Sequence, residues 1–114
     1  MTPDEFRDLC LSLPQAVETF PFGEETSVFK TSGNGKIFAL SGLDDARLTI
    51  SVKCDPEEAL AHRAAHSEIT PGYHLNKKHW LTIVVGGEVA GELVEQLVRD
   101  SHALVRPRVG RAPR

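Results

Sequence analysis

The sequence predicts an α+β fold, a two-layer sandwich in which an antiparallel sheet of about five strands carries its helices on one face. Two segments begin with a capping residue followed by proline, at Thr2 and at Asp55, which is a common way for helices to start. Short β-type runs separated by turn residues lie between them, and one apolar run and one amphipathic segment follow the second helix. The predicted element order is therefore α-β-β-β-β-α-β-α.

The first predicted helix has both of its ends marked in the sequence. Thr2 is the expected N-cap, Pro3 occupies the first helical position and Glu5 completes a capping box. Apolar residues fall on one face of this helix, namely Phe6, Leu9, Cys10 and Leu13. Pro14 should end the helix, because proline cannot continue it.

Runs of β-type residues predict strands in the middle of the chain, at about 17–20, 27–31, 36–40 and 47–52. Asn34-Gly35 is the clearest turn signal between them, since both positions tolerate the positive φ of a tight hairpin turn. The segment Gly-Leu-Asp-Asp that ends at Asp45 marks the next reversal. Strands joined by such short turns form an antiparallel meander.

The second half of the chain is expected to hold two helices and one strand. Asp55 caps the first of these helices, whose small alanine side chains should let it pack closely against its neighbour. A loop from about 67 to 79 leads to a strand at 80–85 and to the turn Gly86-Gly87. The last helix stops at Pro107, and its apolar stripe consists of Leu93, Val94, Leu97, Val98, Leu104 and Val105.

The length of 114 residues and the hydrophobic content of 40% indicate one domain with a single core, residues 1–106, followed by a basic tail at 107–114 that we expect to be flexible. No run approaches the ~18 apolar residues of a membrane span, and no secretory signal is visible. We therefore expect a cytoplasmic protein that does not bind membranes. In that compartment Cys10 and Cys54 should be buried thiols.

The net charge of −3 conceals an uneven distribution along the chain. Residues 1–98 hold eight Lys and Arg against fifteen Asp and Glu, whereas residues 99–114 hold five arginines against Asp100. An acidic body repels nucleic acid. Any contact with DNA must therefore come from local basic patches, with modest and salt-sensitive affinity.

Short stretches along the chain resemble the MmcQ/YjbR family of small proteins, namely Phe20-Pro-Phe-Gly-Glu24, Lys36-Ile-Phe-Ala39, Pro71-Gly-Tyr-His-Leu-Asn-Lys-Lys-His-Trp80 and Ser101-His-Ala-Leu-Val105. The resemblance extends from Phe6 to about Val105. It implies a CyaY-like (frataxin-like) sandwich and DNA binding through paired wing-like elements. The hairpin at 30–36 is the matching wing, and its candidate DNA-binding residues are Lys30, Asn34 and Lys36.

The stretch 71–80 combines cations, aromatic rings and an amide in one turn-rich segment. Lysines can contact phosphates, rings can stack on bases and an amide can reach a base edge, so the candidate DNA-binding residues here are His74, Asn76, Lys77, Lys78, His79 and Trp80. The tail adds Arg106, Arg108 and Arg111, which can follow a phosphate backbone. The alternative is that Tyr73 and Trp80 close the edge of the core while the lysines and arginines serve only solubility.

A rival hypothesis makes the chain a protein-interaction or small-ligand-binding module. In that case Tyr73 and Trp80 line a pocket, and the lysines hold an acidic protein partner or a small anionic ligand. A saturable rise in melting temperature would distinguish such a ligand from DNA.

Metal binding and catalysis have little support in the sequence. His62 and His66 lie four residues apart on a predicted helix and could share a metal ion with His74, His79 or Cys54. Arg63, however, stands where a metalloprotease motif has glutamate. The acidic first turn invites comparison with the iron-binding ridge of the frataxin-like fold, but its carboxylates already complement the helix dipole. We predict no metal, no cofactor and no catalytic residues, because nucleophile elbows, Cys-x-x-Cys motifs and paired acid/base carboxylates are missing.

Overall fold

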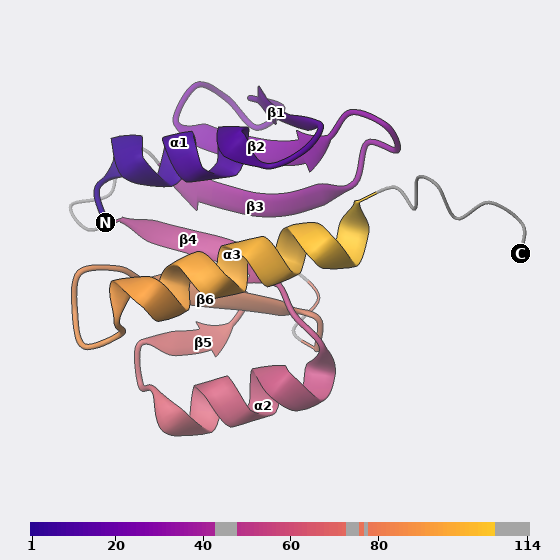
Figure 1. Cartoon of the computed structure of the whole chain (residues 1–114). Coiled ribbons are helices and arrows are strands. Elements are labelled where there is room, and N and C mark those ends of the chain that lie inside the picture. The colour runs from indigo at the N-terminus through magenta and orange to yellow at the C-terminus, as the bar shows by residue number, and fades with distance from the viewer. Residues whose placement is uncertain (43–47, 73–75, 77, 107–114) are drawn as a thin grey trace, which may run out of the picture.

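The computed structural model of this chain describes residues 1–42, 48–72, 76 and 78–106. In chain order its elements are α1 (Pro3–Ser12), β1 (Ala16–Thr19), β2 (Thr26–Thr31), β3 (Ile37–Gly42), β4 (Thr49–Lys53), α2 (Pro56–Ala65), β5 (Ile69–Pro71), β6 (Trp80–Val84) and α3 (Gly91–Val105) (Figure 1). This order confirms the predicted α+β class. It contains one strand more than the sequence predicted.

The sheet has six strands in the order β1-β2-β3-β4-β6-β5, and neighbouring strands run antiparallel. The additional strand, β5, lies in the segment that we expected to be a loop, and it pairs with β6 from Ile69↔Ile83 to Pro71↔Leu81. A strand of three residues that ends in proline is too short to show an alternating pattern in the sequence. The proline is tolerated because β5 is an edge strand, where proline costs no ladder hydrogen bond.

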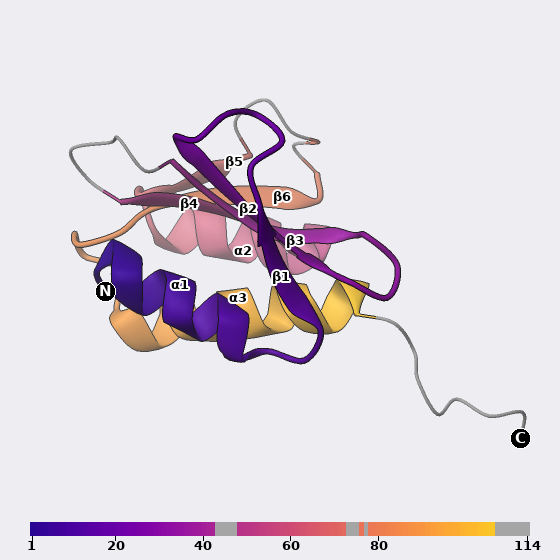
Figure 2. The same cartoon turned by 90° about the horizontal axis from the view of Figure 1, so that it is seen from above.

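The helices lie on one side of the sheet, as predicted (Figure 2). Helices α1 and α3 cover the middle and the β1 side, whereas α2 lies along β5 at the far edge (Figure 1). The core between the two layers contains three rings in contact, with Phe6 edge-on to Phe29 at 5.5 Å and Phe29 tilted against Phe38 at 6.4 Å. None of the helices in the described ranges is long and apolar enough to cross a membrane.

A β-bulge in β3 lies where the centre of the sheet packs against α3. The pairing passes from Phe29↔Ala39 to Lys30↔Ile37, so Phe38 is the extra residue of β3. Phe38 is therefore turned into the core beside Ala39, and both residues are completely buried. Its ring packs edge-on against His102 of α3 at 5.1 Å.

Ser101 of α3 completes the hydrogen bonding where β3 and β4 separate. The ladder between these strands ends at Ala39↔Val52. One residue further, the Ser101 hydroxyl donates to the carbonyl oxygen of Phe38 at 2.6 Å and accepts from the Lys53 amide at 2.8 Å. A single buried side chain thus joins the last helix to both central strands.

The β2–β3 hairpin differs from the tight turn that the sequence predicted, because the residues 32–36 form a longer loop. Gly35 has a φ of +70°, whereas Asn34 stays outside the left-handed region. The Asn34 side chain instead accepts hydrogen bonds from the Thr31 hydroxyl and, at 3.0 Å, from the Lys36 amide. Its amide group donates to the carbonyl oxygen of Val105 at 2.8 Å. The hairpin loop is therefore bound to the C-terminus of α3.

Candidate nucleic-acid interface

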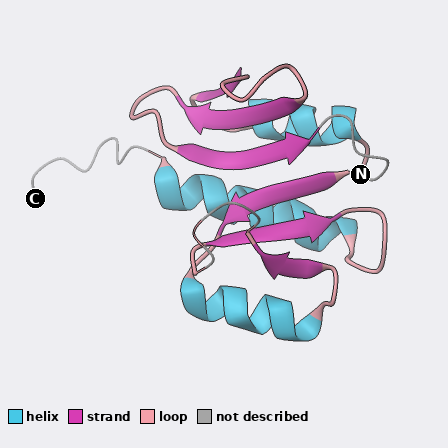
Figure 3. Cartoon of the chain, turned by 180° about the vertical axis from the view of Figure 1, so that it is seen from behind, coloured by secondary structure: helices cyan, strands magenta, loops and turns pink. Residues whose placement is uncertain are grey.

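One end of the sheet gathers most of the described candidate residues. The pairs Lys30↔Ile37, Ala39↔Val52 and Lys53↔Trp80 place the end of β2, the end of β4 and the start of β6 at the same end. The hydrogen bond from Asn34 to Val105 adds the C-terminus of α3. Figures 1 and 3 show this end from the two sides of the sheet. We call it the basic end.

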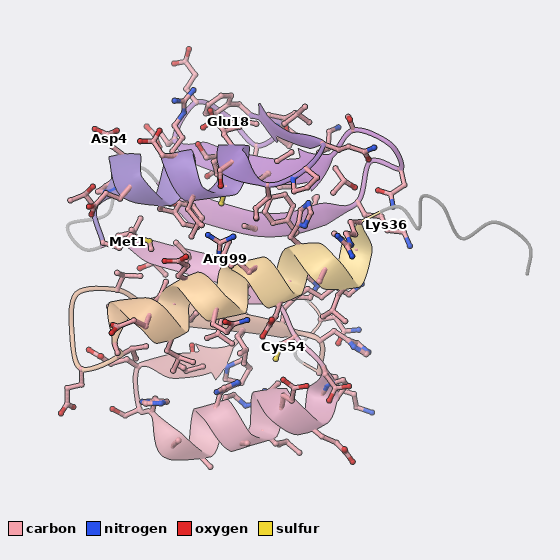
Figure 4. All side chains as sticks on the ribbon, viewed as in Figure 1. Met1, Asp4, Glu18, Lys36, Cys54 and Arg99 are labelled. Carbon is pink, nitrogen blue, oxygen red and sulfur yellow. The ribbon has the colours of Figure 1, made fainter. Side chains whose placement is uncertain are left out.

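The basic end carries five described cations, Lys30, Lys36, Lys53, Lys78 and Arg106. Lys36, Lys78 and Arg106 are exposed, whereas Lys30 and Lys53 are half-buried along their strands. Figure 4 labels Lys36 at the hairpin loop, close to the end of α3. Four further candidates, His74, Lys77, Arg108 and Arg111, and Tyr73 lie outside the described residues.

The segment before β6 is held by Asn76. Its side-chain oxygen accepts from the Lys78 amide at 2.9 Å, and its backbone carbonyl accepts from the amides of His79 and Trp80 at 3.2 and 3.0 Å. The carbonyl of His79 in turn accepts from the Cys54 amide at 2.7 Å. The side chain of Asn76, whose amide we expected to meet a base edge, thus shapes the turn through its oxygen. The Lys78 and His79 side chains are exposed.

Trp80 and Lys53 are cross-strand neighbours on the face of the sheet turned away from the helices, which we call the open face (Figure 3). This follows from strand alternation, because Leu81 and Val52 point into the core. Both Trp80 and Lys53 are half-buried. Lys53 was not among the residues predicted from the sequence, and only the β4–β6 register reveals that it lies opposite the tryptophan.

Carboxylates border the basic end on the helix side. Asp55 caps α2 by accepting from the amides of Glu57 and Glu58 at 3.2 and 3.3 Å. Glu58 and Asp55 also lie close enough to Cys54 to add to the effect of burial, which raises the pKa of that thiol to about 11. Cys54 is therefore a protonated, unreactive thiol near neutral pH. A polyanion would have to approach from the open face, away from these carboxylates.

Three further histidines lie on or next to the helices α2 and α3. His62 and His66 are half-buried on and next to α2. Among the residues described, no group of three or more His, Cys, Asp or Glu side chains could hold a metal ion. His102 is 3% exposed and its Nε2 lies 2.8 Å from the carbonyl oxygen of Pro14, which ties α3 to the end of α1.

Comparisons with known proteins agree on one group of relatives. The protein-family model described as YjbR matches residues 11–104. Escherichia coli O157:H7 has a protein named "Uncharacterized protein YbdF" that is 41% identical over 97 residues, 85% of this chain and 78% of that one. "Uncharacterized protein YjbR" of Escherichia coli K12 is 29% identical over 102 residues, 90% of this chain and 85% of that one.

Solved structures show the same likeness. The crystal structure of a Deinococcus radiodurans protein described with a DUF419 domain has a TM-score of 0.88 and 44% identity, covering 94% of this chain and 80% of that chain. A crystal structure of a Pseudomonas syringae protein has a TM-score of 0.81 and 27% identity, covering 93% of this chain and 100% of that chain. The implied CyaY-like relationship stays a prediction.

Proposed function

We propose that this chain, which belongs to the YjbR family, is a cytoplasmic, non-catalytic protein that binds DNA weakly at the basic end. Phosphates would contact Lys36, Lys78 and Arg106, and His79 and Trp80 would lie beside them. The single observation that carries the proposal is the strand register, which brings cations from separate parts of the sequence to one end of the sheet.

The charges around the basic end set the expected strength of binding. The three exposed cations are offset by the carboxylates that begin α2 and by the acidic body of the chain. Each phosphate contact releases condensed counterions, so affinity should fall steeply as salt rises. Weak binding that depends on backbone contacts should also tolerate changes in DNA sequence.

Fluorescence anisotropy tests this proposal. A labelled random duplex and a matching single strand are titrated with the full chain at low salt and near physiological salt. We expect saturable binding, with a slope of log K against log salt of about −0.9 for each phosphate contact. No binding to either probe at low salt would refute the proposal and favour the small-ligand or protein-partner hypothesis.

Single-charge variants locate the interface. Lys36→Ala and Lys78→Ala should each weaken binding and reduce the salt slope by about 0.9. Arg99→Ala removes the same charge from the exposed face of α3, where Arg99 pairs with Glu95 at 2.9 Å (Figure 4), and should leave the slope unchanged. Equal effects of all three substitutions would mean that only net charge matters and that the basic end is not the binding site.

A further inference from the structure

A cavity of about 320 Å³ lies at the other end of the sheet, between the start of α1 and the ends of β1, β2 and β3. It is lined by Pro3, Asp4, Phe6, Arg7, Glu18, Phe20, Ser27, Phe29 and Ser41. The pair Ser27↔Ser41 places it at the end of the β2–β3 ladder opposite the hairpin loop. The cavity is therefore separate from the basic end, and its volume lies at the small end of the range for ligand pockets.

Aromatic rings form the apolar part of this cavity. Phe6 and Phe29 are buried beneath it and meet edge-to-face at 5.5 Å. Phe20, at the end of β1, forms a wall and is 46% exposed. A large ring that stays half-exposed beside a hollow is apolar surface that a ligand can cover. The ring faces also carry partial negative charge, which attracts cations.

The polar part of the cavity is built around Glu18. Its side chain is 10% exposed, and it accepts from the Nε of Arg7 at 2.7 Å and from the Ser27 hydroxyl at 2.6 Å. Asp4 contributes a second carboxylate on the exposed side of α1 (Figure 4). The lining thus holds two carboxylates against one guanidinium, and its formal charge is −1.

Ser41 supplies a further polar group at the floor. The residue is 2% exposed, and its hydroxyl lies 3.4 Å from the carbonyl oxygen of Gly42, which is long for a hydrogen bond. Because a hydroxyl oxygen keeps two lone pairs while its O–H donates, it can also accept from a donor inside the cavity. A ligand with several N–H donors would satisfy both Ser41 and the carboxylates.

We propose that this cavity binds a small organic cation, a primary amine joined to a short aromatic or aliphatic group. The ammonium lies toward Asp4, Glu18 and the Ser41 hydroxyl, and the apolar group covers Phe20 and the rings beneath it. The cavity's net negative charge selects an amine over a carboxylate of the same shape. Nothing in this proposal depends on DNA binding.

Three probes of similar shape test the charge preference. Phenethylamine, 2-phenylethanol and 3-phenylpropionate are titrated into the ¹⁵N-labelled full chain, and amide shifts are followed by NMR. We expect saturable shifts with phenethylamine at the start of α1 and in β1–β3, and binding at least fivefold weaker for the alcohol and the acid. Tighter binding of 3-phenylpropionate, or no saturable shift with the amine at millimolar concentration, would overturn the proposal.

Paired variants test the named residues against close controls. Asp4→Asn should weaken phenethylamine binding roughly fivefold, the effect of losing one charge contact in water, whereas Asp8→Asn, one turn further along α1, should change it less than twofold. Phe20→Ala should weaken binding, whereas Phe22→Ala, in the same loop but outside the lining, should not. Equal effects within either pair would place the amine elsewhere and reject the site.

Discussion

Replacing Ser101 with alanine should destabilise the fold strongly, because one hydroxyl satisfies two buried backbone groups. The substitution leaves the Phe38 carbonyl and the Lys53 amide without the partners that lie at 2.6 and 2.8 Å. Each unsatisfied buried group costs about 1–3 kcal/mol, so we expect a loss of roughly 2–6 kcal/mol in the free energy of unfolding. That is a large part of the 5–15 kcal/mol typical of a domain.

Urea unfolding followed by Trp80 fluorescence and by circular dichroism measures this loss, since the chain has one tryptophan. Ser32→Ala, which removes an exposed hydroxyl from the β2–β3 loop, is the control and should change stability by no more than about 0.5 kcal/mol. If Ser101→Ala is as mild as the control, Phe38 and Lys53 must find other partners, and the bridging role assigned to Ser101 is wrong.

Three other predictions follow from side chains that bind the backbone or are buried. A Cβ at Gly87 would overlap the Glu68 carboxylate, which accepts from the amides of Glu88 and Val89. Gly87→Ala and Glu68→Ala should therefore each lower the free energy of unfolding by about 1–3 kcal/mol. The two losses should not add in the double mutant, as urea unfolding can show. The pKa of Cys54 is raised from 9.0 to about 11, so the unfolded chain ionises first and stability should fall from about pH 9 to 11. Burial also raises the pKa of Cys10, so Cys54→Ala should reduce this fall without abolishing it, as thermal melts at several pH values can show. Asn34→Asp keeps the side-chain acceptor for the Lys36 amide but loses the donor to the Val105 carbonyl. Amide hydrogen exchange in the last turn of α3 should therefore become faster, with little change inside the hairpin loop. An unchanged exchange rate in that turn would contradict the contact.

Local signals in the sequence predicted the helix starts well. The capping box is present, with the Glu5 amide donating to the Thr2 hydroxyl at 3.1 Å and the Thr2 amide donating to Glu5 at 2.8 Å. Asp55 caps α2 as expected. These interactions join residues within one turn of each other, so the residue types and their spacing determine them.

Long-range contacts could not be predicted in the same way. The bulge at Phe38 depends on the register of two strands, and the bridge from Ser101 depends on where α3 crosses them. Ser101 belongs to a stretch that carries the family resemblance, but nothing in the sequence indicates its hydrogen-bond partners. Lys53 gives no sign of facing Trp80 until β4 and β6 are paired. For the candidate interface, the residue types could be predicted from the sequence. Which of these residues lie next to each other depends on the pairing of distant strands.

The hydrogen bond between Asn34 and Val105, 71 residues apart in sequence, constrains the length of the β2–β3 loop. Exposed hairpin loops usually accept inserted residues, because their tips touch nothing else. Here an insertion between Thr31 and Lys36 would pull the Asn34 amide away from the end of α3. A peptide tag or a label placed in this loop would therefore disturb the last helix, although the two segments look independent along the chain.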